Sequence, residues 1–122
     1  MVIFLDTYAI IEIAIDNPLY RKYVEQGNIG IATIFNLVEV HFYYLKHHGQ
    51  KDADVIYNIV KDMVVRIDDS IVREANMFKI KHKKKRFSFA DCIGYVTARR
   101  YNAEFLTGDY MFKGLEGVEF VK

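Results

Sequence analysis

Residues 2–7 read VIFLDT: four apolar residues followed by an acid and a hydroxyl. An unbroken apolar run of this length is typical of a strand that is buried on both faces. No basic residues precede the run, and Asp6 ends it after only a few positions, so it does not match a secretion signal. We therefore expect a buried strand at residues 2–5 and a helix from about Thr7.

Farther along the chain, short apolar segments alternate with amphipathic segments of helical period. Further strands are predicted at residues 29–32, 64–67, 104–106 and 118–121. Further helices are predicted after the Asn17-Pro18 start signal, at 33–47 with Thr33 as cap, at 52–63, from Asp68, and at 88–101. This alternation implies right-handed crossovers and a sheet covered on both faces. The predicted fold class is α/β, a three-layer α/β/α sandwich with a mostly parallel sheet of four to five strands.

Apolar residues recur at helical spacing on three of the predicted helices. The stripe of helix 33–47 consists of Ile34, Leu37, Val38, His41 and Leu45. The helix at 52–63 has Val55, Ile59, Val60 and Met63 at helical spacing, and the helix from Asp68 has Ile71, Ala75 and Phe78.

The composition suits a single cytoplasmic domain. The chain has 122 residues, which match one domain spanning 1–122, and 52% of them are hydrophobic, enough for a core. Its apolar runs are short and interrupted by charge, so we expect no membrane-spanning segment. The lone cysteine, Cys92, excludes an intrachain disulfide and fits a reducing compartment.

Positive charge is concentrated in one segment. Residues 79–86 read KIKHKKKR and carry six positive charges; without them, the net charge of +1 becomes −5. An acidic body alone would repel nucleic acid, so a basic strip on it is a candidate for gripping phosphates. A solvated basic loop is the alternative interpretation.

Two aspartates directly follow predicted strands. Asp6 ends the first strand, and Asp109 follows the strand at 104–106 through a Thr107-Gly108 turn. In an open parallel sheet, ligands bind outside the carboxyl ends of the strands, where both carboxylates would lie. Each has an ordinary alternative. Asp6 could cap the next helix, a task that Thr7 could also perform, and Asp109 could be a simple turn aspartate.

Two further acids lie in predicted helices. Glu39 has mostly apolar or aromatic neighbours at helical spacing, and a carboxylate without a partner is costly to bury on such a face, which argues against surface decoration. Asp91 follows Ser88 at the spacing of a capping box. It also lies in the first turn of a helix beside the basic run, so it can serve both as a cap and as part of a site.

Four carboxylates in one place would need a counter-charge. Two carboxylates about 5 Å apart repel by roughly 3 kcal/mol at an effective dielectric constant of about 20. A cluster of Asp6, Glu39, Asp91 and Asp109 would persist only with bound cations or raised pKa values. Oxygen-only ligands favour Mg²⁺ or Mn²⁺. Zinc is not expected, because the histidines form no plausible Cys/His ligand set.

Four segments together resemble one known family. They are Leu5-Asp6-Thr7, Glu39 within its helix, residues 88–92 (SFADC) and residues 106–112 (LTGDYMF). Their order, their placement on strands and helices, and the separations of 33, 52 and 18 residues between the acids are similar to those of PIN domains, particularly the VapC toxins. The resemblance covers essentially the whole chain and rests on the ordered set rather than on any single motif.

The resemblance implies an endoribonuclease that depends on Mg²⁺ or Mn²⁺. Asp6, Glu39, Asp91 and Asp109 would be its catalytic and metal-site residues, with Thr7, Ser88 and Thr107 as supporting hydroxyls. It also implies a homodimer that is silenced by a VapB-type antitoxin. In such an enzyme, the basic run would hold the RNA backbone through Lys81, Lys83, Lys84, Lys85 and Arg86.

Two positions depart from the family pattern. Tyr8 stands where the family often has a small polar residue, which would alter the pocket beside Asp6. Met111 stands where some members carry an additional acid, so we expect no fifth metal-site carboxylate.

Two other classes of protein compete with this interpretation. A receiver-like signalling domain also gathers aspartates and Mg²⁺ at strand ends, but the later phosphoacceptor and lysine that it requires are not found here. A non-catalytic nucleic-acid-binding or protein-interaction module would keep the basic run and would not need the four acids. Loss of RNA processing on mutation of Asp6 distinguishes the nuclease from such a module.

Overall fold

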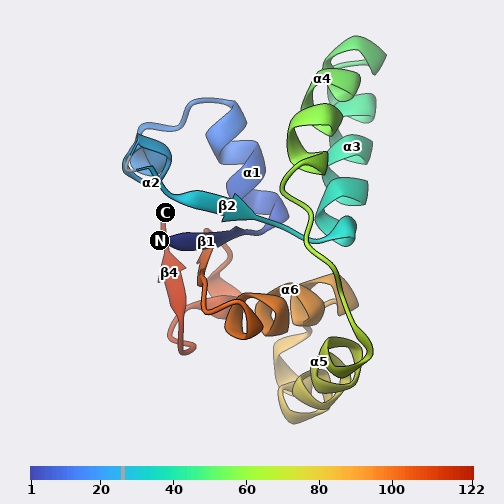
Figure 1. Ribbon diagram of the computed structural model, residues 1–122, viewed down its shortest axis with the longest axis vertical. Coiled ribbons are helices and arrows are strands. Elements are labelled where there is room, and N and C mark those ends of the chain that lie inside the picture. The colour runs from blue at the N-terminus through green and yellow to red at the C-terminus, as the bar shows by residue number, and fades with distance from the viewer. Residues whose placement is uncertain (26) are drawn as a thin grey trace.

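The computed structural model of the protein describes residues 1–25 and 27–122 (Figure 1). These residues form four strands: β1 (Val2–Leu5), β2 (Ile29–Ile31), β3 (Glu104–Thr107) and β4 (Val118–Phe120). They form six α-helices: α1 (Thr7–Ala14), α2 (Arg21–Glu25), α3 (Ile34–His47), α4 (Gln50–Lys61), α5 (Asp69–Lys81) and α6 (Phe89–Arg100). They also form three short 3-10 helices: η1 (Pro18–Tyr20), η2 (Lys83–Lys85) and η3 (Tyr110–Phe112).

The four strands of the described chain make one parallel sheet in the order β2-β1-β3-β4. In the centre, Ile3 pairs with Glu104 and Leu5 pairs with Leu106. The chain places β2 on one side of β1 and later adds β3 on the other side, so the strand order reverses between β1 and β3. Open α/β sheets bind ligands outside the carboxyl ends of the strands at such a reversal. The predicted α/β class with a parallel sheet is confirmed.

Helices cover both faces of the sheet (Figure 1). On one face, Ile3, Leu5 and Leu106 belong to a core that α1, α3 and α4 complete. On the other face, the rings of Phe4 and Phe105 stack with their centroids 5.3 Å apart and join a core with α5 and α6. Successive residues of a strand point to opposite faces, so even these short strands supply both cores.

The predicted strand at residues 64–67 is wrong. Among the described residues, Val64 makes only an isolated parallel bridge with Ala32, beyond the end of β2. The chain then runs on from α4 to α5 (Figure 1). Val65 and Ile67 pack against the core on the α5–α6 side. Their apolar, β-branched character therefore reflects burial of a connection rather than membership of the sheet.

The apolar stripe of α3 is not the face that packs into the core. The buried residues of α3 are Asn36, Leu37, Val40 and Tyr44, of which only Leu37 belongs to that stripe. Ile34, Val38 and Leu45 are exposed, Val38 to 60%. Because α3 carries apolar residues on two faces, helical period alone does not identify the face that meets the sheet.

The apolar residues at helical spacing differ in burial in the next two helices. In α4, Val60 is buried, whereas Val55 and Ile59 are exposed. In α5, Ile71 and Ala75 are both buried. Across the described residues, no helix combines the length and the apolarity that crossing a bilayer requires.

Candidate active site

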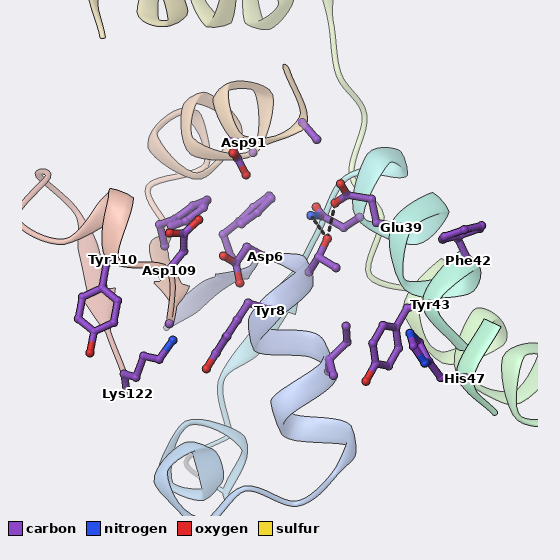
Figure 2. A pocket seen from close by; sticks show the side chains of 18 of the residues that line it. Asp6, Tyr8, Glu39, Phe42, Tyr43, His47, Asp91, Asp109, Tyr110 and Lys122 are labelled. Atoms are coloured by element: carbon purple, nitrogen blue, oxygen red, sulfur yellow. Dashed lines mark hydrogen bonds between the residues drawn. The ribbon is translucent and has the colours of Figure 1, made fainter. Parts of the chain in front are cut away.

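All four predicted acids line one cavity of about 610 Å³ (Figure 2). Asp6 follows β1 and Asp109 follows β3, so both lie where the strand order reverses. Asp91 lies in the first turn of α6, and Glu39 lies in the middle of α3. Helices from both faces of the sheet therefore meet the strand ends at this cavity, and the fold brings together four segments that are distant in the sequence.

Both carboxylate oxygens of Asp6 accept hydrogen bonds. Oδ1 accepts one from the Ala9 N–H at 2.8 Å, so Asp6 rather than Thr7 caps α1. Oδ2 accepts one from the hydroxyl of Thr107, at the end of β3. The capping alternative for Asp6 is thus realised, and the second bond ties the ends of the two central strands together.

The surroundings of Asp6 disfavour its charge. Burial, the largest influence, raises the pKa of Asp6 from 3.8 to about 7. The carboxylates of Asp91 and Asp109 act in the same direction, while the two hydrogen bonds to Asp6 lower its pKa. A cation beside Asp6 would favour the charged carboxylate and would lower this pKa.

Asp109 is held by the turn that follows β3. Its N–H donates to Thr107 Oγ1 at 3.0 Å, and its Oδ1 accepts from the Met111 N–H at 2.9 Å. Thr107 is fully buried and links the two aspartates through its single hydroxyl. Asp109 is therefore a turn residue, as the alternative interpretation proposed, and it also faces the cavity.

Asp91 forms a capping box with Ser88, as their spacing predicts. The Ser88 N–H donates to Asp91 Oδ2 at 2.9 Å, and the Asp91 N–H donates to Ser88 Oγ at 3.0 Å. In the described part of the chain, the other oxygen, Oδ1, accepts no hydrogen bond. Asp91 can therefore cap α6 and present an oxygen to the cavity at the same time.

Glu39 is exposed at the cavity, so the cost of burying a carboxylate, which argued for a special role from the sequence, does not apply to it. Thr7 Oγ1 donates to Glu39 Oε1 at 2.5 Å, and the buried Asn36 donates to Thr7 Oγ1 at 3.2 Å (Figure 2). Asn36 in turn accepts from the Thr33 N–H at 2.9 Å. This chain of hydrogen bonds, rather than burial, orients the Glu39 carboxylate.

The donor chemistry of the cavity fits a hard divalent cation. Its four carboxylates offer the oxygen ligands that Mg²⁺ and Mn²⁺ prefer. Within residues 1–25 and 27–122, no three acidic, histidine or cysteine side chains are close enough to form a compact ligand cluster. Mg²⁺ usually keeps several waters and binds only one or two carboxylates directly, so acids spread around a cavity still suit it.

A comparison with protein families agrees with this geometry. The family described as the PIN domain matches residues 3–118. The chain belongs to the PIN-domain family. Among curated proteins, no sequence matches it significantly.

Solved structures share the fold of this PIN domain at low sequence identity. A toxin–antitoxin complex from Klebsiella pneumoniae matches with a TM-score of 0.77 at 18% identity, covering 96% of this chain and 95% of the other. VapC20 from Mycobacterium tuberculosis, a toxin that cleaves the sarcin-ricin loop, matches with a TM-score of 0.72 at 19% identity, covering 98% and 99%. VapBC2 from Rickettsia felis, bound to a DNA fragment from its promoter, matches with a TM-score of 0.77 at 16% identity, covering 100% of both chains.

The basic run of this PIN domain lies beside the cavity, not in it. Lys81 ends α5, Lys83–Lys85 form η2, and Arg86 has a left-handed backbone with φ of 57°. All five predicted RNA-binding residues are exposed, and none is among the described residues that line the acidic cavity. Lys85 Nζ donates to the Met111 carbonyl at 3.4 Å, so the run reaches the loop that follows Asp109. Its contact with RNA stays a prediction.

Several residues that line the cavity of this PIN domain were not predicted from the sequence. They are Asn36, Lys46, His47, Tyr110 and Lys122. Asn36 could have been predicted to form a capping box with the helix cap Thr33, because it follows Thr33 at the same spacing as Asp91 follows Ser88. Tyr110 could also have been predicted to line the cavity, because it directly follows Asp109. Lys122 follows β4, and its place depends on how β4 pairs with β3, which no local pattern reveals.

Proposed function

We propose that this protein is a divalent-metal-dependent endoribonuclease that acts in the cytoplasm as the toxin of a VapBC-type pair. The observation that carries the proposal is the convergence of four acids, from four separate segments, on one cavity at the strand reversal. The similarity in fold to VapC20 and to toxin–antitoxin complexes supports the toxin assignment.

In this proposal, Asp6, Glu39, Asp91 and Asp109 would hold Mg²⁺ or Mn²⁺, one or two of them directly and the others through water molecules bound to the metal. A metal held there would lower the pKa of a water molecule and would stabilise negative charge on the scissile phosphate. Hydrolysis then joins the water oxygen to phosphorus, breaks the bond to the 3′ oxygen, and leaves a 3′-hydroxyl and a 5′-phosphate. No nucleophilic side chain is needed.

The remaining task of the chain is to hold the acids in place before RNA arrives. The hydroxyl of Thr107 donates to Asp6, and that of Thr7 donates to Glu39. Ser88 fixes the orientation of Asp91 through the capping box. Because these contacts belong to strand ends and helix starts, the acids rest on rigid elements rather than on loose loops.

We expect the purified protein to cut single-stranded RNA when Mg²⁺ or Mn²⁺ is present and to leave it intact in EDTA. The products should carry a 5′-phosphate and a 3′-hydroxyl, which end-labelling with and without prior phosphatase treatment measures. Cutting that persists in EDTA, or products with a cyclic 2′,3′-phosphate, would contradict the metal mechanism. RNA that is bound but never cut under any of these conditions would favour a non-catalytic binding module.

Two apolar surfaces outside the cavity support separate sites for an antitoxin and for a second copy of the chain. A groove of about 530 Å³ is lined mostly by apolar residues of α1, α2 and α4, among them Ile13, Val24 and Ile59. Its lining suits the apolar face of an antitoxin helix. On α3, Ile34, Val38 and Leu45 form an exposed apolar stripe that suits a homodimer contact.

These two surfaces should respond differently to one added charge. We expect Val38→Glu to convert a dimer to a monomer in light scattering, because the stripe on α3 would be disrupted. Ile59→Glu is the matched control, since Ile59 is 57% exposed and lies in the groove instead. It should leave the dimer intact and prevent co-purification of a co-expressed antitoxin. If Val38→Glu and Ile59→Glu change the molar mass measured by light scattering to the same extent, the stripe on α3 is not the dimer contact.

A further inference from the structure

One wall of the acidic cavity is built from two tyrosines and a lysine. The Lys122 Nζ lies 4.8 Å from the centroid of the Tyr8 ring and 5.0 Å from that of the Tyr110 ring. All three side chains line the same cavity as the four acids. Figure 2 shows them together on the side of Asp6 and Asp109, away from Tyr43 and His47 of α3. We call this group the Tyr8–Lys122–Tyr110 wall.

Packing holds both rings of the wall in place. The Tyr8 ring occupies the space where any side chain at Gly108 would lie, so a Cβ at that position would collide with it. Tyr8 therefore rests directly on the turn that carries Asp109. The Tyr110 ring packs against the ring of Phe120 in β4, with the two ring centroids 5.0 Å apart. Lys122 lies between these two rings, so its position is set by β4 and by the turn after β3.

Structural packing alone does not account for the wall. Tyr110 is 62% exposed, so most of its ring is available to a ligand. Lys122 forms no salt bridge with any described acid, although acids line the same cavity. An RNA strand entering this cavity brings phosphates toward four carboxylates, and a positive charge at the wall lowers that repulsion.

We propose that the Tyr8–Lys122–Tyr110 wall binds the nucleotide next to the scissile phosphate in single-stranded RNA. In this subsite, the exposed face of Tyr110 stacks on the base, and Lys122 pairs with the adjoining phosphate. Tyr8 holds Lys122 in position through its ring. The proposal rests on the proposed ribonuclease function, and it adds a substrate-binding site that is separate from the basic run.

Stacking is tested with a short single-stranded RNA that carries 2-aminopurine, in EDTA so that binding is measured without cleavage. Wild-type protein should quench the probe, and Tyr110→Ala should weaken binding about 5- to 100-fold and abolish quenching. Tyr110→Phe should retain both. Tyr101→Ala is the control, because Tyr101 is also an exposed tyrosine and lies outside the cavity. Thermal melting should show that all these variants are folded.

The phosphate contact is tested through the salt dependence of the same binding. Lys122→Gln should reduce the slope of log affinity against log salt by about 0.7, the value for one contact on a single strand. Lys113→Gln should not, because Lys113 lies over Phe120 and outside the cavity. An alanine variant of Lys81, Lys83, Lys84, Lys85 and Arg86 should lower the slope while keeping the quenching.

The binding and cleavage assays together distinguish a failure of this subsite from a failure of the nuclease proposal. If Tyr110→Ala binds and quenches like Tyr101→Ala, or if wild-type protein fails to quench the probe, the subsite is overturned, whatever the cleavage assay shows. If quenching depends on Tyr110 but RNA is never cut with Mg²⁺ or Mn²⁺, the subsite stands and the nuclease proposal fails.

Discussion

Asp6→Asn should abolish RNA cleavage and, at the same time, make the metal-free protein more stable. We expect the cleavage rate to fall by roughly 10³-fold or more, because several kcal/mol of charge stabilisation in the transition state depends on the metal. The gain in stability follows from the raised pKa of Asp6, about 7 in the folded protein against an ordinary value of 3.8. Asparagine can keep the cap of α1 without carrying a charge.

The effect of Asp6 on stability depends on pH in a defined direction. Below about pH 4 the carboxyl is protonated in both the folded and the unfolded protein, and its raised pKa costs nothing. Between about pH 4 and 7, unfolding releases a proton, so stability falls as pH rises. Above pH 7 the accumulated cost is at most about 4 kcal/mol. Asp6→Asn should therefore be more stable than wild type at pH 8, by about 1–3 kcal/mol, and equal to it near pH 4.

Denaturant unfolding at pH 4 and pH 8, with and without Mg²⁺, measures this prediction. Added Mg²⁺ should stabilise the wild type by mass action and leave Asp6→Asn unchanged. Asp62→Asn is the matched control, because Asp62 is an exposed aspartate at the end of α4 that forms no salt bridge within the described residues. A destabilised Asp6→Asn protein at pH 8, or one that still cuts RNA, would remove Asp6 from the metal site.

The first strand and the starts of α1 and α6 were predictable because their causes are local. The side chains of β1 enter the cores on both sides of the sheet, so the strand is apolar on both of its faces. The Ser88–Asp91 spacing predicts the capping box because the box closes within one turn of α6. The ends of β1 and β3 then placed Asp6 and Asp109 at one edge of the sheet. For these features, neighbouring residues carry enough information.

Features set by tertiary packing were not predictable in this way. The two faces of α3 are both apolar, and only contact with α1 and the sheet decides that Leu37 is buried and Val38 exposed. Glu39 owes its orientation to Thr7, which comes from another segment 32 residues away. Lys122 reaches Tyr8 only because β4 lies beside β3. Such placements depend on the complete fold rather than on the residues adjacent in the sequence.

Asp91→Asn should separate the structural duty of Asp91 from its proposed catalytic duty. Asparagine has a carbonyl oxygen that can accept the Ser88 N–H, which Asp91 Oδ2 accepts at 2.9 Å, so the cap of α6 should survive. The amide nitrogen then replaces the oxygen that faces the cavity, and the charge that would bind a metal is lost. We expect RNA cleavage to fall by roughly 10²-fold or more, while the free energy of unfolding changes by less than about 0.5 kcal/mol.

Two companion variants make that separation measurable. Asp68→Asn applies the same chemical change to the cap of α5, where Asp68 accepts the Ile71 N–H at 2.9 Å, far along the chain from the acids. It should affect neither cleavage nor stability appreciably. Ser88→Ala removes the hydroxyl that caps α6 and should cost about 1 kcal/mol of stability, with a smaller loss of cleavage than Asp91→Asn. If Asp91→Asn lowers stability as much as Ser88→Ala while cleavage persists, Asp91 is only a cap, and the cavity has three functional acids instead of four.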